Sequence, residues 1–128
     1  MRRFISSAVF AAALAAPAGA APIKMTPAVQ KDVQCFLLFA VASDQAADDK
    51  SKQGTALALT YFMGKLAVSA PGLNLAAAIQ QEGEAFKNNT HAKEVGDACD
   101  AEFGKVGTQL QSLGSDLQKS EPAPAPKK

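Results

Sequence analysis

Two widely separated cysteines constrain the fold of this 128-residue chain more than any other feature. Cys35 lies in the apolar run DVQCFLLFAVA, and Cys99 lies far downstream in VGDACDAEFG. A bond between them would close a loop of about 65 residues, which the chain-entropy model credits with roughly 4 kcal/mol of stabilisation. Whether the two thiols form that bond depends on the compartment in which the protein folds.

The first 20 residues predict a secretory signal peptide. Arg2 and Arg3 precede an Ala-rich apolar segment, and the small residues AGA at 18–20 offer a signal-peptidase cleavage site. The apolar part is shorter than the roughly 20 residues that an ordinary membrane-spanning helix needs. We therefore expect a periplasmic or secreted protein without stable membrane insertion after cleavage, and an uncleaved N-terminal anchor is the alternative.

Export favours a disulfide between Cys35 and Cys99, because paired cysteines normally form a bond in an oxidising compartment. A redox motif of the C-x-x-C kind would need the two cysteines close together. Zinc needs about four ligands, whereas the chain adds only His91 to its two cysteines. A Cys–His nucleophile pair is formally available, although His91 lies in the polar segment NNTHAKE. Catalysis and metal binding thus stay open as lesser alternatives.

Abundant alanine and apolar residues at helical spacing predict four helices. The first begins with Thr26 as N-cap and Pro27 as first residue, and Val33, Leu38 and Val41 contribute to its broad apolar face. The other expected segments are a solvated loop at 48–54, helices at 55–69 and 74–88, and a last helix from its cap Thr90 to about 117. Leu59, Phe62, Met63 and Leu66 form the expected inner face of the second helix.

These segments predict an all-α fold, a small bundle of about four helices stapled by one disulfide. The signal peptide occupies residues 1–20 and the helical domain residues 21–119. Residues 120–128 read SEPAPAPKK, which predicts a disordered Pro/Ala/Lys tail because such a segment cannot bury a core.

The last helix carries the clearest periodicity of the chain. Its apolar residues recur every three or four positions over about six turns, and they are Val95, Cys99, Phe103, Val106, Leu110, Leu113 and Leu117. Gly107 and Gly114 lie seven apart beside this seam, where they would let another backbone approach closely. Because this helix is longer than the others, part of the seam needs a further surface, and a homodimer is the economical way to supply one.

The segment YFMGKL, residues 61–66, lies between the two cysteines and is followed by PGLNL. This combination resembles a loose group of small, uncharacterised exported bacterial helical proteins with a Y-[FY]-[LM]-G-[RK]-[LI] element between two cysteines. The resemblance implies an all-α exported domain and no particular activity. A weaker likeness of architecture is to acid-stress chaperones of the HdeA type, in which one disulfide joins an early and a late helix. Cys35 and Cys99 would fill those roles here.

No motif in the chain predicts catalysis. There is no G-x-S-x-G elbow, and Glu82 and Glu84 at i and i+2 cannot share one helix face as an acid/base pair. Asp44, Asp48 and Asp49 do not follow the spacing of a calcium loop. We expect no enzyme, no cofactor and no metal ion.

The charge pattern argues against nucleic acid as a partner. Both arginines leave with the signal peptide, so the mature chain has no arginine for bidentate phosphate recognition. Its acidic and basic side chains are nearly balanced, so no basic patch attracts polyanions.

These observations together predict an exported protein that acts by binding, with another protein or a second copy of itself as partner. The candidate interaction surface consists of Tyr61, Phe62, Gly64, Leu110, Leu113 and Leu117. One alternative is an acid-stress chaperone whose dimer opens at low pH. Another is a carrier of a small apolar ligand, which would need a cavity lined by Phe36, Leu59, Phe62 and Phe86.

Overall fold

The computed structural model describes residues 21–87 and 89–120, which contain four α-helices and no strand. Their bounds are α1 Pro27–Gln45, α2 Asp49–Ser69, α3 Leu75–Ala85 and α4 Asn89–Ser120. The predicted all-α bundle with one disulfide is confirmed. The predicted signal peptide and residues 121–128 of the predicted tail lie outside the described residues.

Polar caps fix where the first three helices begin. The Thr26 hydroxyl accepts a hydrogen bond from the Val29 backbone N–H at 3.3 Å, as predicted for the N-cap of α1. The Asp48 carboxylate accepts from the Ser51 N–H at 2.9 Å and caps α2. The Asn74 side chain caps α3. Each cap supplies a partner for a backbone N–H that the first turn leaves unpaired.

Two predicted boundaries are wrong. The segment 48–54 was expected to be a solvated loop, yet α2 begins at Asp49, because Asp48 caps a polar sequence that is still compatible with a helix. Similarly, α4 begins at Asn89, so Thr90 lies inside its first turn and is not its N-cap.

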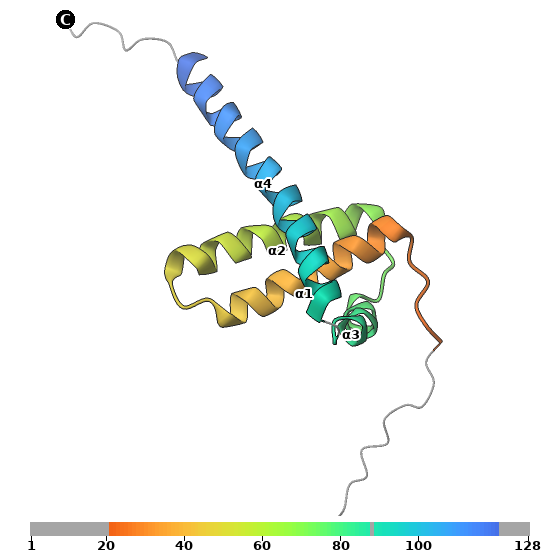
Figure 1. Ribbon diagram of the computed structural model, residues 1–128. Helices are drawn as coiled ribbons and strands as arrows, with labels where there is room; N and C mark the ends of the chain where they lie inside the picture. The colour runs from red at the N-terminus through yellow and green to blue at the C-terminus, as the bar shows by residue number, and fades with distance from the viewer. Residues whose placement is uncertain (1–20, 88, 121–128) are drawn as a thin grey trace, which may run out of the picture.

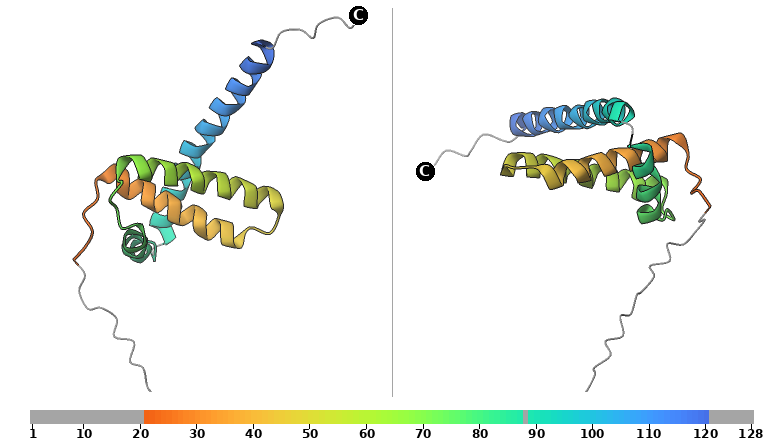
Figure 2. Two further views of the ribbon diagram at one scale, coloured as in Figure 1. Left: turned by 180° about the vertical axis from the view of Figure 1, so that it is seen from behind. Right: turned by 60° about the horizontal axis from the view of Figure 1, so that its bottom comes forward.

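The helix α1 is the centre of the fold, since α2, α3 and α4 all pack against it. Figure 1 shows α1 and α2 side by side as an antiparallel hairpin, with the short α3 near one end. The long α4 crosses this hairpin as a second layer, and its C-terminal half projects beyond the other helices (Figures 1 and 2). We call α1, α2 and α3 with their connections, residues 27–85, the head.

The core of the head has two parts. The first joins α1 to α2 and α3, and its buried residues are Val29, Val33, Leu66 and Ala78. The second joins α1 to α2 and α4, and its buried residues are Cys35, Phe62 and Cys99. Among the described residues, the second cluster is the one that holds α4 on the head through buried side chains, and its α4 members lie in the first half of that helix.

Two residues expected inside are exposed: Met63 of α2 and Val41 of α1. In α2, the stripe that faces α1 is filled by Ala58, Phe62 and Leu66, which follow one another at i+4. Met63 lies about 100° around the helix from Phe62 and therefore points away from this contact. Val41 lies in the C-terminal half of α1, whereas the buried residues of this helix all lie between Val29 and Cys35.

Candidate functional site

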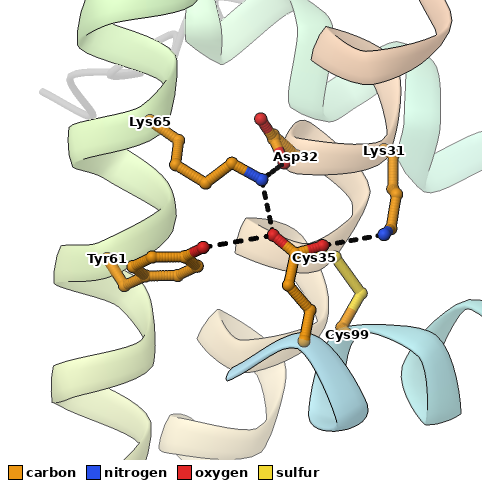
Figure 3. Close-up of a disulfide and its surroundings, with 7 residues drawn as sticks. Lys31, Asp32, Cys35, Tyr61, Lys65 and Cys99 are labelled. Carbon is orange, nitrogen blue, oxygen red and sulfur yellow. Dashed lines mark hydrogen bonds and ion pairs between the residues drawn. A yellow bond between two sulfur atoms is a disulfide. The ribbon is translucent and has the colours of Figure 1, made fainter. Parts of the chain in front are cut away.

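The predicted bond between Cys35 and Cys99 is present and links the middle of α1 to α4 (Figure 3). The two Cα atoms lie 5.5 Å apart, and both residues are buried. This disulfide indicates a non-reducing compartment. Both sulfur atoms are consumed in a buried link, which fits a structural role and leaves no thiolate as nucleophile.

A network of charged side chains lies beside the disulfide and connects three helices (Figure 3). The Lys65 ammonium of α2 donates to Asp32 Oδ1 of α1 at 2.6 Å and to Glu102 Oε1 of α4 at 2.5 Å. The Lys31 ammonium donates to Glu102 Oε2 at 2.7 Å. The Tyr61 hydroxyl donates to Glu102 Oε1 at 3.3 Å. Glu102 is thus the residue through which α4 reaches both α1 and α2.

The pKa shifts of Glu102 and Lys65 favour the charged forms of these two groups. Burial raises the pKa of Glu102, but hydrogen bonds and attraction from Lys31 and Lys65 outweigh burial and lower that pKa to about 2. Burial lowers the pKa of Lys65, yet its bonds to Asp32 and Glu102 leave the pKa raised. Burial, followed by the negative charge of Glu102, raises the pKa of Tyr61. None of these groups is prepared to exchange a proton near neutral pH, so the network is a structural ion pair.

A second polar cluster joins α3 to α1. Glu82 is 2% exposed, and its carboxylate accepts from Gln34 Nε2 at 2.6 Å and from Gln30 Nε2 at 3.1 Å. Next to it, the Gln81 amide pairs with both the N–H and the carbonyl of Ile23, at 2.7 and 3.1 Å. These contacts satisfy the buried polar groups and fasten the segment before α1. They bring together amides and one carboxylate, which are engaged in hydrogen bonds inside the fold.

The remaining candidate residues for chemistry are separated in the structure. Across the described ranges 21–87 and 89–120, no group of three or more His, Cys, Asp or Glu could hold a metal ion. His91 lies at the start of α4 with its ring centroid 5.8 Å from that of Phe86. Asp48 serves as the cap of α2. In the described part of the chain, no helix is both long and apolar enough to cross a membrane.

An exposed apolar surface lies on the projecting half of α4. Leu110, Leu113 and Leu117 are 64%, 56% and 62% exposed. By the helical period, they continue the face that carries the buried Cys99 and the half-buried Phe103 earlier in α4. We call Val106, Leu110, Leu113 and Leu117 the α4 stripe. Val106 is half-buried and the three leucines that follow are exposed, in agreement with the projecting C-terminal half of α4 in Figures 1 and 2.

The structure divides the predicted interaction surface into different parts. Phe62 was expected on it but is fully buried, with its ring 5.8 Å from that of Phe39. Tyr61 is half-buried and faces α4, 6.0 Å from the Phe103 ring. Gly64 is exposed, and a Cβ there would meet nothing within 4 Å, so no close helix crossing explains it. Only the three leucines of α4 form an aligned apolar surface among the predicted residues.

Sequence reasoning missed a second apolar strip. Leu57 and Val68 are exposed on the flank of α2 that also carries Tyr61. The spacing 57, 61, 64, 68 is helical and could have revealed it. The strip is interrupted by Gly64 and by polar neighbours, so it is less continuous than the α4 stripe.

Comparisons of this chain with models of protein families, with curated proteins and with solved structures find no match. The function therefore has to be inferred from the surfaces and side chains of the molecule itself.

Proposed function

We propose that this is an exported, periplasmic or secreted protein that acts as a protein-binding module through the α4 stripe. One observation carries the proposal: three leucines in register on one helix face are more than half exposed where α4 projects beyond the head. The predicted signal peptide at 1–20 and the Cys35–Cys99 bond support export.

The exposed leucines are aligned, which distinguishes them from ordinary surface apolar residues. Single exposed leucines are common and need no explanation, but a contiguous apolar patch with polar borders is typical of an interaction site. Removing such surface from water yields roughly 25 cal/mol per Å². An apolar stripe at spacings of three and four residues fits another helix or a helix-binding groove.

Other functions receive less support. The two polar clusters are engaged in ion pairs and hydrogen bonds inside the fold, which suits structural groups better than catalytic ones. A carrier of an apolar ligand would need Phe62 to line a cavity, but its ring packs against Phe39 and Tyr61. An acid-triggered chaperone would need α4 to loosen in acid, and the ion pairs of Glu102 with Lys31 and Lys65 oppose this until the carboxylate is protonated, near its pKa of about 2.

Photo-crosslinking from single positions of α4 tests the proposal. A photoreactive amino acid replaces Leu113 in the stripe or, as control, Thr108, which is exposed on the opposite face. Irradiation is carried out in the native compartment, and the adducts are identified by mass. We expect discrete protein adducts from position 113 and few from position 108. Equal yields from both positions, or no adduct from 113, would contradict binding through the stripe.

A further inference from the structure

We propose that the occupant of the α4 stripe is a second copy of this chain, bound with the two α4 helices antiparallel and related by a twofold axis. This inference rests on the proposed function and names its partner. It follows from four features of the described residues: the position of the head, the register of the apolar residues, the positions of two glycines, and the charges that border the stripe.

The position of the head excludes a parallel pair. The head covers the face of α4 at Cys99 and Phe103, which is the same face that carries the stripe. In a parallel pair, the first half of the partner's α4 would need the space that the head occupies. In an antiparallel pair, the projecting halves overlap and the two heads lie at opposite ends.

The register of the stripe is self-complementary. Apolar residues that alternate by three and four positions occupy the a and d positions of a heptad. Across an antiparallel pair, an a residue of one helix faces a d residue of the other. With Leu110 opposite the partner's Leu113, Val106 lies opposite the partner's Leu117. The twofold axis repeats both contacts, so each leucine of the stripe is covered.

The glycines fall on one flank of this pair. In the same register, Gly107 lies opposite the partner's Gly114. By the twofold symmetry, Gly114 also lies opposite the partner's Gly107. A Cβ at either position would meet nothing within 4 Å in the folded chain, so the protein's own fold gives no steric reason for these poor helix formers. Two glycines opposite each other allow the backbones to approach closely along that flank.

The charges on the other flank are compatible. Asp116 lies opposite the partner's Gln109, and the partner's Lys105 is one turn away from that glutamine. This placement brings a carboxylate within reach of an amide and an ammonium group, twice by symmetry. Antiparallel helices also oppose their dipoles.

The expected contact is small. It covers residues 106–117 of each chain, about 18 Å of helix at 1.5 Å per residue, and ends where the head begins. Such an interface is below the roughly 1,200 Å² of standard stable complexes. We therefore expect a monomer–dimer equilibrium that dilution shifts.

Sedimentation and native mass spectrometry of the purified mature chain over a wide concentration range test the pairing. We expect a dimer that dissociates on dilution and a dissociation constant at least about tenfold weaker for Leu113→Ser. The residue is exposed, so the variant should keep the wild-type melting temperature when both are monomeric. Thr108→Ala is the matched control and should leave the constant unchanged. A wild type that is monomeric at all concentrations would overturn the inference.

Crosslinking tests the orientation. L110C and L113C are prepared separately with the Cys35–Cys99 bond intact, then oxidised mildly alone and as a mixture. The antiparallel register predicts that the mixture forms the L110C–L113C pair faster than either variant pairs with itself. Faster self-pairing of L110C would indicate a parallel pair and overturn the inference. A chain that stays monomeric while position 113 crosslinks to a different protein would refute self-pairing and leave the proposed function standing.

Discussion

The two halves of α4 carry the same apolar period but have different surroundings. In the first half, Cys99 is buried and Phe103 packs against the head. In the second, Leu110 and Leu117 are more than half exposed. The periodicity therefore reports that a helix has an apolar face, but the length of the neighbouring helices decides how much of that face is covered within one chain.

The first half is held by three kinds of interaction that the second half lacks in the described residues. These are the bond to Cys35, the ion pairs of Glu102 with Lys31 and Lys65, and ring contacts of Phe103 with Phe39 at 5.9 Å and Tyr61 at 6.0 Å. In the described part of the chain, the polar contacts of the second half stay within its own helix. An example is the exposed pair between Lys119 and Asp116, which contributes little.

The largest expected effect comes from removing the disulfide. Without this bond, the first half of α4 should be held on the head less firmly and so become more like the second half. For a loop of 64 residues, the double variant Cys35→Ala/Cys99→Ala should lose about 4 kcal/mol of unfolding free energy. The melting temperature should fall by roughly 15 °C or more. Urea unfolding and thermal melting measure these changes, and hydrogen exchange should show faster opening in the first half of α4. A loss below about 1 kcal/mol would mean that the bond is dispensable.

Truncating one apolar residue in each half tests the contrast directly. Phe103→Ala removes ring contacts with the head and should cost about 2–3 kcal/mol. Leu113→Ala should change the unfolding free energy by less than about 0.5 kcal/mol when the chain is monomeric, because the side chain is already exposed. Chemical denaturation at high dilution compares the two. Equal costs in both halves would contradict the difference in burial.

The ion network should contribute less than the disulfide. Glu102→Gln removes the charge that Lys31 and Lys65 share, and we expect a loss on the order of 2 kcal/mol after allowing for the partial exposure of both lysines. Asp97→Asn is the control, since Asp97 pairs with Lys93 on the exposed side of α4. The control should change stability by less than about 0.5 kcal/mol. A similar loss in both variants would argue against a special role of Glu102.

The same residue predicts a pH dependence. The pKa of Glu102 is about 2 in the folded state and 4.5 in the unfolded reference. Its carboxylate therefore contributes stability that is fully present above pH 4.5 and is lost as the pH falls through about 2. The difference in unfolding free energy between wild type and Glu102→Gln should shrink over this interval. A difference that stays constant from pH 6 to pH 2, measured by urea titrations, would show that charge is not its cause.

The sequence predicted those parts of the fold that depend on local patterns or on a single long-range constraint. The cap at Thr26 and the period of α4 are local, and the Cys35–Cys99 bond was expected from two cysteines and a predicted export signal. The exposure of the α4 stripe at Leu110 and Leu113 was also predictable from the sequence, because it follows from the greater length of α4.

Other features could not be predicted because they depend on how helices meet. Glu82 becomes buried only when α3 brings it to Gln30 and Gln34 of α1. The polar residues around Glu82 in the sequence do not predict this burial. Glu102 is similar, since its three partners come from two other helices. Phe62 was predicted both on the inner face of the second helix and on the interaction surface. The first prediction is confirmed and the second is wrong, because the ring is buried against Phe39.

The smallest expected effect concerns the glycine flank of the second half, and it should have opposite signs for folding and for pairing. Gly114→Ala places a better helix former at an exposed position, so the monomer should gain about 0.5–1 kcal/mol of unfolding free energy. The added methyl group also occupies the flank where the partner's Gly107 would lie, so the dimer should dissociate more readily. Gly104→Ala is the matched control, because Gly104 lies on the far side of α4 and a Cβ there would also meet nothing within 4 Å. It should give the same gain in stability without weakening the dimer. Thermal melting at low concentration and sedimentation at high concentration measure the two effects separately. A Gly114→Ala chain that is more stable and dimerises as well as the Gly104→Ala chain would show that no backbone approaches this flank, and the second half of α4 would then lack the close contact that its glycines allow.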